Sequence, residues 1–160
     1  MITDLAVDIQ AVDTLLGRYS QVLDDQDWQL WPTLFAAECC YEVQTLDNAE
    51  RGLPLAYMLD DNRSRIIDRI KFITEVWAGT IEPYRTRHVA QRTSYVATGA
   101  STYSVRSNFQ VSYSEVDGPP AILASGYYDD VIELVGGEAL FRVRRAYLDG
   151  MPARYLVYPL

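Results

Sequence analysis

Residues 103–113 carry the clearest alternation of apolar and polar positions in the chain. Apolar or aromatic side chains occupy every second position, and Ser107 is the one polar residue among them. This period of two predicts a β-strand with one buried face in an antiparallel sheet. At about 3.3 Å per residue the strand would be about 35 Å long. We therefore expect a sheet that curls around whatever fills its concave side.

The first part of the chain has the spacing of an amphipathic helix. Apolar side chains recur alternately every four and three residues, at Leu5, Ile9, Val12, Leu16, Tyr19 and Leu23. We expect this helix to begin at Thr3, a favourable N-cap, and to end near Leu23. Beyond it, Asp27 is expected to cap a short helix over residues 28–31, and Pro32 to open another turn.

A second long helix is predicted over residues 62–77. Its buried stripe would consist of Ile66, Ile70, Ile73 and Trp77, with Ile67 and Val76 beside it. We expect Asp60 or Asp61 to cap this helix, and Arg69 to face solvent unless another group binds it. The preceding residues 46–59 show no period and are expected to form a loop.

The remainder of the chain is predicted to be mostly strands. They are expected over residues 39–45, 84–98, 103–113, 121–135 and 138–148. Turn signals occur at residues 118–120 and at Gly136-Gly137, and the apolar residues 155–160 should be held on the sheet or against a partner. Helices followed by strands predict an α+β fold, a single domain over residues 1–160. The N-terminal helices would pack in a strongly curved antiparallel or mixed sheet, forming a cone whose mouth is either a pocket or a plugged core.

Composition and charge narrow the class of protein. The net charge is −8 without a cluster of Lys and Arg, so we expect no binding to nucleic acid or to an anionic membrane. No apolar run reaches the roughly 18 residues of a membrane span, and no basic stretch followed by an apolar block indicates a secretory signal. The two cysteines, Cys39 and Cys40, are adjacent and are expected to stay reduced, which suits the cytoplasm.

The supply of metal ligands excludes the common redox metal sites in this chain alone. The sequence contains one histidine, His88. A Rieske cluster requires two His and two Cys ligands, and the mononuclear iron facial triad requires two His and a carboxylate. The phosphate-binding motifs GxxxxGK[ST] and GxGxxG are missing from the sequence, as is the nucleophile elbow GxSxG. We therefore expect neither a cofactor nor a metal bound by this chain.

One group of polar residues could still carry chemistry. Asp24, Asp25 and Asp27 follow the first helix, while Arg85, Arg87 and His88 open a strand, and the two regions can meet near the mouth of the cone. A carboxylate that orients an imidazole would form a general acid–base pair, here Asp24 with His88. The alternative is a structural ion pair in which Arg87 and His88 join strand to helix through Asp24 or Asp68.

The chain resembles the small (β) subunit of aromatic-ring-hydroxylating oxygenases, the Rieske non-haem iron dioxygenases, over nearly its whole length. The matching residues, in order, are Arg18, Tyr19, Leu23, Asp24, Asp25, Asp27, Trp31, Pro32, Leu34, Phe35, Cys40, Tyr41, Val43, Asp68, Arg69, Ile70, Arg85, Arg87, His88, Ser107, Asn108, Phe109, Gly126, Tyr127, Tyr128, Asp129, Phe141, Arg144, Asp149, Pro159 and Leu160. This resemblance implies a nuclear-transport-factor-2-like (NTF2-like) cone. It also implies assembly with a large α subunit, usually as an α3β3 hexamer.

In that family the α subunit holds the Rieske [2Fe–2S] cluster and the mononuclear Fe(II), and receives electrons from a ferredoxin or reductase. The resemblance carries over no catalytic residue, and Trp77, Tyr84, Arg85 and Arg87 are candidates for an interface or framework. The short tail over residues 156–160 resembles the subgroup that acts on carboxylated aromatics such as terephthalate, anthranilate or salicylate.

A second resemblance points to a different class of function. The residues from Leu23 to Trp28 look like the Asp-containing stretch of the scytalone dehydratase-like enzymes. That resemblance implies a stand-alone dehydratase or isomerase on the same cone, with Asp24 and His88 as its acid–base pair. An open apolar cavity at these two residues would favour the enzyme, and a filled cone with His88 held in a salt bridge would disfavour it.

In the β-subunit interpretation, Arg87→Ala should impair folding or assembly and leave turnover per assembled site unchanged.

Overall fold

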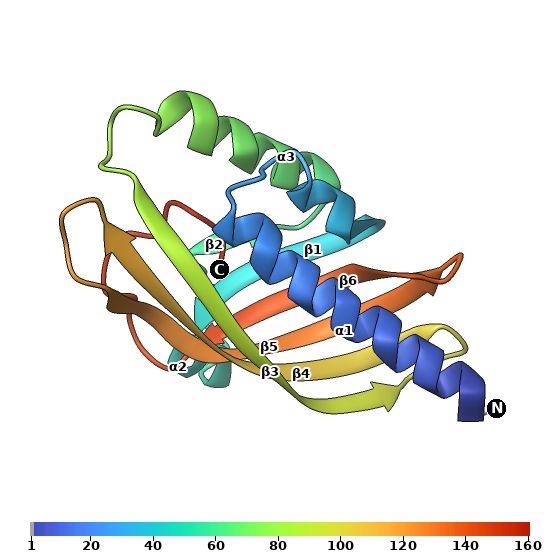
Figure 1. Ribbon diagram of the computed structural model, residues 1–160. Coiled ribbons are helices and arrows are strands. Elements are labelled where there is room, and N and C mark those ends of the chain that lie inside the picture. Colours follow the sequence, from blue (N-terminus) through green and yellow to red (C-terminus); the bar gives the residue numbers. More distant parts are fainter. Residues whose placement is uncertain (1) are drawn as a thin grey trace.

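The computed structural model describes residues 2–160, and side chains from residue 6 onward, as a six-stranded curled sheet with the two longer helices on one side (Figure 1). The strand order is β2-β1-β6-β5-β4-β3, and the sheet curls without closing. The elements are α1 (Ile2–Asp24), η1 (Trp31–Leu34), β1 (Phe35–Thr45), α2 (Leu46–Glu50), β2 (Met58–Asp60), α3 (Arg63–Lys71), η2 (Phe72–Val76), β3 (Tyr84–Ala97), β4 (Thr102–Glu115), β5 (Ala121–Val135) and β6 (Glu138–Leu148). The predicted α+β class with a curved mixed sheet is confirmed.

The strands follow the predicted alternation closely. Strand β4 pairs antiparallel with β3 and β5, and β5 pairs antiparallel with β6. Strand β1 lies parallel to β6, which makes the sheet mixed. The predicted bounds of β5 and β6 match the structure, whereas β1 begins at Phe35, four residues earlier than expected. Its pairing with β6 is irregular between Phe35 and Cys40, and this irregularity breaks the pattern at the start of the strand.

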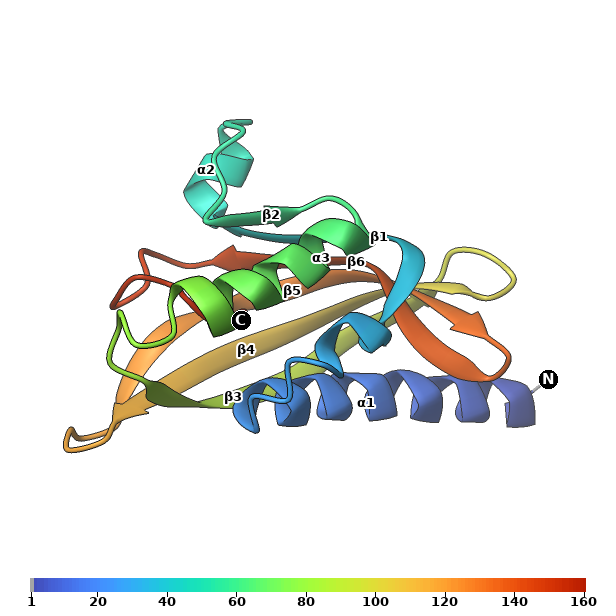
Figure 2. The same ribbon diagram turned by 90° about the horizontal axis from the view of Figure 1, so that it is seen from above.

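Helix α1 lies along β3 in both views (Figures 1 and 2) and begins one residue before the predicted start. The proposed N-cap of Thr3 and the burial of Leu5 concern side chains outside the described part. The buried face further along is formed by Val12, Leu15, Tyr19, Val22 and Leu23, so Leu15 is the buried residue where the sequence indicated Leu16. Among the described residues, no helix is long and apolar enough to cross a membrane.

The segment after α1 differs from the prediction. Residues 25–30 form turns, and the expected helix capped by Asp27 does not form. Gln26 has a φ of 56°, in the left-handed region, and this conformation ends the helical path. Pro32 does open a helical turn, the 3-10 helix η1.

The predicted loop over residues 46–59 is wrong in part. It contains the short helix α2, whose N-cap Thr45 accepts a hydrogen bond from the backbone N–H of Asn48. It also contains the start of β2, which pairs antiparallel with β1. Neither element is long enough to produce a visible period.

The second long helix is shorter and is capped by a different residue. Helix α3 ends at Lys71 and continues as the π-helical turn η2. Its N-cap is Asn62, whose side chain accepts from the backbone N–H of Arg65, so the caps predicted at Asp60 and Asp61 are wrong. Asp60 is instead part of β2 and forms an ion pair with Arg69. Ile66, Ile70 and Ile73 are buried as predicted, whereas Trp77 is half-buried and Ile67 and Val76 are exposed.

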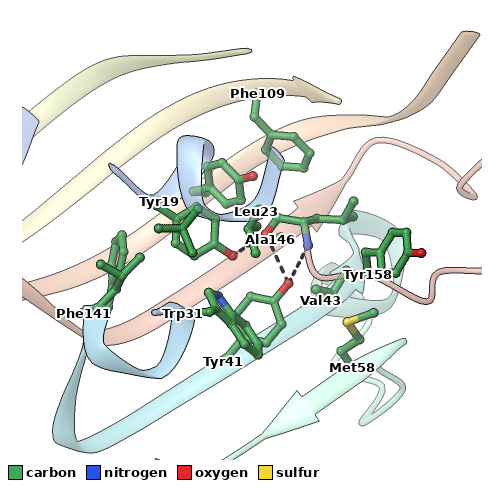
Figure 3. Packing of buried hydrophobic residues seen from close by; sticks show 14 of the residues in the cluster. Tyr19, Leu23, Trp31, Tyr41, Val43, Met58, Phe109, Phe141, Ala146 and Tyr158 are labelled. Atoms are coloured by element: carbon green, nitrogen blue, oxygen red, sulfur yellow. Dashed lines mark hydrogen bonds between the residues drawn. The ribbon is translucent and has the colours of Figure 1, made fainter. Parts of the chain in front are cut away.

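The concave side of the sheet is filled by aromatic rings and by the last residues of the chain (Figure 3). Leu156, Val157, Tyr158 and Leu160 are buried there, as residues 155–160 were expected to be. The hydroxyls of Tyr19 and Tyr41 donate to the carbonyl oxygen of Leu160 at 2.6 and 3.1 Å, and the Tyr41 hydroxyl accepts from the Leu160 N–H at 2.8 Å. The inside of the cone is therefore a packed core.

A buried ion pair lies in the same core. Arg144 Nη1 donates to Asp130 Oδ2 at 2.8 Å, and both side chains are fully buried. The guanidinium carbon of Arg144 lies 3.9 Å from the ring centre of Tyr19 and 3.6 Å from that of Tyr128. Burial raises the pKa of Asp130 to about 7, although Arg144 acts in the opposite direction. The pair joins neighbouring strands β5 and β6 to α1.

Candidate functional site

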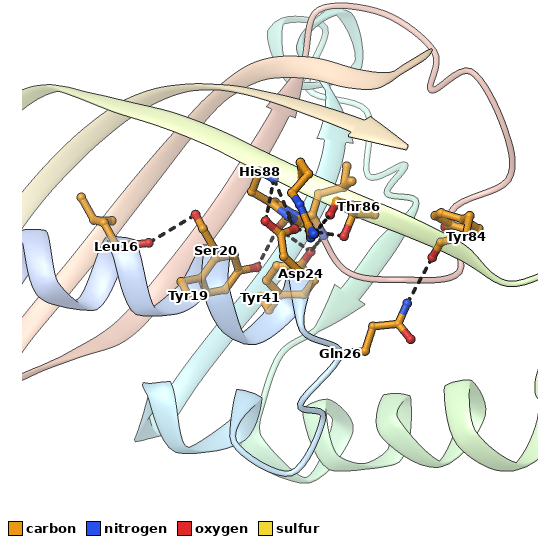
Figure 4. A network of polar contacts seen from close by, with 11 residues as sticks. Leu16, Tyr19, Ser20, Asp24, Gln26, Tyr41, Tyr84, Thr86 and His88 are labelled. Atoms are coloured by element: carbon orange, nitrogen blue, oxygen red, sulfur yellow. Dashed lines mark hydrogen bonds and ion pairs between the residues drawn. The ribbon is translucent and has the colours of Figure 1, made fainter. Parts of the chain in front are cut away.

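The end of α1 meets the start of β3, as the sequence predicted for Asp24 and His88 (Figure 4). The Asp24 Oδ1 atom lies 2.6 Å from His88 Nδ1, and the side chains are 13% and 1% exposed, respectively. An ionised carboxylate is acceptor-only, so His88 Nδ1 carries the hydrogen and donates. The carboxylate therefore fixes both the orientation and the tautomer of the imidazole.

The same carboxylate binds the backbone of β3. The N–H of His88 donates to both Asp24 oxygens at 3.0 and 3.2 Å, and the Thr86 hydroxyl donates at 3.1 Å. Two residues further along the chain, Gln26 Nε2 donates to the carbonyl oxygen of Tyr84 at 3.1 Å. Strand β3 is at the edge of the sheet, so these side chains satisfy backbone groups that have no partner strand.

The hydrogen bonds also set the charge state of Asp24. Burial alone would raise its pKa, but the hydrogen bonds and charge of His88, together with the hydroxyl of Thr86, outweigh burial and lower the pKa below its ordinary value. Asp24 is thus a carboxylate at neutral pH.

The other imidazole nitrogen limits what this pair can do chemically. His88 Nε2 is buried and has no hydrogen-bond partner among the described residues. A general base must come within hydrogen-bond reach of the proton that it removes. Because the concave side is packed and Nε2 is buried, the geometry suits a structural contact between α1 and β3 better than an acid–base catalyst.

The four candidate interface or framework residues fall into two groups. Tyr84 is buried and packs against Tyr158 at a ring-centre distance of 4.6 Å, and Trp77 is half-buried and packs against Tyr155 at 5.3 Å. These two rings therefore pack against other aromatic rings of the chain. The exposed Arg85 and Arg87 line a surface groove of about 710 Å³.

The structure does not form the ion pair that the sequence suggested for Arg87. Its Nη1 atom donates to the carbonyl oxygen of Thr86 at 3.0 Å, and Asp68 pairs with Lys71 at 3.7 Å. Asp25 lines the same groove as Arg87. The contributions of Thr86 and Gln26 were missed, although Thr86 shares the buried face of β3 with His88 and could have been found from that alternation.

The donor set of this chain does not fit a Rieske cluster or a facial-triad iron. Its single imidazole is bound to Asp24, and its only thiols are the neighbouring Cys39 and Cys40 of β1. Burial raises the pKa of both thiols, which disfavours the thiolate that a metal binds. In the described part of the chain, no group of three or more His, Cys, Asp or Glu side chains could hold a metal ion.

The curled mixed sheet, packed around a long N-terminal helix, defines the class of protein as an NTF2-like α+β domain. A family profile described as "Ring hydroxylating beta subunit" matches residues 18–151, and the chain belongs to this family of aromatic-ring-hydroxylating dioxygenase β subunits.

Individual relatives agree with the family. The chain is 29% identical over 133 residues to the Comamonas sp. terephthalate 1,2-dioxygenase terminal oxygenase component subunit beta 2, covering 83% of this chain and 85% of that one. It is 28% identical over 124 residues to the Burkholderia cepacia anthranilate 1,2-dioxygenase small subunit, covering 77% and 76%. A crystal structure from Novosphingobium aromaticivorans, assigned as the β subunit of an aromatic-ring-hydroxylating dioxygenase, superposes with a TM-score of 0.87 at 26% identity and full coverage of both chains. The predicted family and the NTF2-like fold are confirmed.

Proposed function

We propose that this chain is a non-catalytic β subunit that supports the terminal oxygenase of a Rieske non-haem iron dioxygenase as an α3β3 hexamer. In this proposal residues 1–160 form one domain, and the large α subunit holds the [2Fe–2S] cluster and the mononuclear Fe(II). A ferredoxin or reductase supplies the electrons, and the assembly works in the cytoplasm on a carboxylated aromatic. The relatives named for terephthalate and anthranilate support that substrate class.

The observation that carries the proposal is the use of the only imidazole. The His88 side chain is bound to Asp24 and is buried. The family profile matches residues 18–151, which include both residues. The concave side, where a cone of this type could hold a substrate, is occupied by the chain's own residues 156–160. Together these features support a scaffold role.

Expression of the chain alone and together with its large subunit tests the proposal. Alone, it should bind no stoichiometric iron, show no Rieske absorption and oxygenate no arene. Together, the two chains should elute as an α3β3 species, and terephthalate, anthranilate and salicylate can be compared as substrates. Iron and oxygenase activity in the isolated chain would refute the scaffold role, as would failure to associate with the large subunit.

A second candidate function has one observation in its favour. Asp24 and His88 lie within hydrogen-bond reach and Nε2 has no described partner, the arrangement of an acid–base pair in a dehydratase or isomerase. The variant His88→Asn separates the two candidates. In the scaffold role it should lower stability or assembly while turnover per assembled hexamer stays the same. Dehydratase or isomerase activity in the isolated wild-type chain that is lost in a folded His88→Asn variant would favour the catalytic pair.

A further inference from the structure

A surface groove next to the Asp24–His88 contact has an unusual electrostatic character. It lies between the end of α1, the start of β3 and the end of β4 with the turn that follows, and its volume is about 710 Å³. Arg85 and Arg87 stand two residues apart on the exposed face of β3 and line this groove. Side chains at this spacing point the same way and lie about 7 Å apart.

The two arginines lack the counter-charges that most cations in this protein have. In the described part of the chain, neither guanidinium lies within ion-pair distance of a carboxylate, whereas nine other Lys and Arg side chains do: Arg51, Arg65, Arg69, Lys71, Arg92, Arg142, Arg144, Arg145 and Arg154. Two adjacent unpaired positive charges are a distinct feature in a chain with a net charge of −8.

The carboxylates of the groove itself are mostly engaged elsewhere. Asp24 is held by His88 and Thr86, and Glu115 is held by Arg154 at 2.6 Å. Asp25 is the remaining carboxylate that lines the groove. The positive charge of Arg85 and Arg87 is therefore available to a group from outside the chain.

The base of the groove is held by side-chain hydrogen bonds to the backbone of β3. Asp24 and Gln26 hold the backbone of β3 at residues 84–88, as Figure 4 shows. Below this backbone the Tyr84 ring is buried, and the guanidinium carbon of Arg154 lies 4.2 Å from its centre. A site built on fixed backbone loses little conformational entropy when it binds, which favours affinity.

Exposed apolar side chains flank the two arginines. Val89, the next residue on the same face of β3, is 68% exposed, and Val116, directly after the end of β4, is 80% exposed. Protein interfaces are enriched in Arg and combine it with apolar contacts, whereas a site for a small anion needs only the charges.

We propose that this Arg85/Arg87 groove is the docking site for an acidic segment of the large oxygenase subunit. The segment would present two carboxylates about 7 Å apart, one to each guanidinium, with apolar contacts to Val89 and Val116. Because the rest of this acidic chain repels a negative segment, the pair of arginines defines where it can approach. This inference rests on the proposed function and names the surface that serves it.

The test measures binding of a tagged large oxygenase subunit to purified variants of this chain, at 50 and 500 mM NaCl. R85E/R87E should weaken binding about 100-fold or more, because each reversal places like charges together. R85Q/R87Q should weaken it about 10-fold and remove most of the salt dependence. Arg87→Ala should fold normally, since its one described contact is to the neighbouring Thr86 carbonyl, and bind more weakly.

The matched control is R51E/R142E, which changes the net charge equally at two exposed positions, one directly after α2 and one on β6. It should bind within about 2-fold of the wild type. Circular dichroism and thermal melting establish whether each variant is folded. If R85E/R87E does not fold, the binding of R85Q/R87Q decides whether the groove is the docking site. Wild-type affinity in a folded R85E/R87E, or equal losses in the control, would overturn the inference while the proposed function stands. If the wild type itself does not bind, the proposed function fails instead.

Discussion

The substitution Asp24→Ala tests whether one carboxylate fastens α1 to the edge of the sheet. It removes the acceptor for three donors: the His88 N–H, the His88 Nδ1–H and the Thr86 hydroxyl. Hydrogen bonds to a charged group contribute about 1.5–3 kcal/mol each, which would sum to about 5–9 kcal/mol. Water can reach part of the site, because the Asp24 side chain is 13% exposed. We therefore expect a loss of about 3–5 kcal/mol in the free energy of unfolding.

Urea unfolding, followed by tryptophan fluorescence, measures this loss. A loss of 3–5 kcal/mol should lower the melting temperature by roughly 6–20 °C, since 1 kcal/mol corresponds to about 2–4 °C for a domain of this size. Asp25→Ala is the matched control, because Asp25 is the adjacent acid and makes no side-chain hydrogen bond within the described residues. Asp24→Asn, which keeps one acceptor oxygen, should fall between the two. If Asp24→Ala and Asp25→Ala differ by less than about 1 kcal/mol, the fastening role is refuted.

Three further predictions concern pH and packing. The folded state lowers the pKa of Asp24, so the stability that this carboxylate contributes is present above the ordinary pKa of 3.8 and is lost as the pH falls through the lower folded pKa. In urea titrations at several pH values, the difference in free energy of unfolding between wild type and Asp24→Asn should therefore disappear in acid. A difference that stays constant with pH would contradict this. Gly126→Ala would place a Cβ 1.9 Å from the backbone oxygen of Tyr147 and should cost about 3 kcal/mol or more in urea unfolding; a loss below about 1 kcal/mol would show that the strands separate easily. Arg144→Met leaves Asp130 buried without its cation and should lower the free energy of unfolding by about 3–5 kcal/mol. The double variant Arg144→Met/Asp130→Leu should recover much of that loss. A double variant no more stable than Arg144→Met would argue against an unpaired charge as the cause.

The strands of this fold were readable because each has one buried and one exposed face. β5 and β6 could be bounded to the residue, since alternation continues up to the Gly136-Gly137 turn, where both glycines have positive φ. The errors fall where no period exists. Gln26 ends a helical path through a backbone angle that its sequence does not indicate, and α2 and β2 are too short for a pattern.

The candidate site was predictable in position but not in detail. That Asp24 and His88 meet follows from packing α1 along β3, the edge strand of a curled sheet. Their exact partners depend on which backbone groups of β3 face the free edge, and a side-chain pattern does not carry that information. Alternation would have separated the buried Tyr84 from the exposed Arg85, which were grouped together by their closeness in sequence.

The contact between α1 and β3 also has a bearing on what the sheet can join. A strand from another molecule extends a sheet by pairing with the free N–H and C=O groups of its outermost strand. Along the first residues of β3 those groups are taken, the His88 N–H by Asp24 and the Tyr84 carbonyl by Gln26. Asp24 and Gln26 therefore also prevent a strand of another molecule from pairing with the start of this edge strand. A variant without Asp24 should expose these backbone groups and form aggregates rich in β-structure.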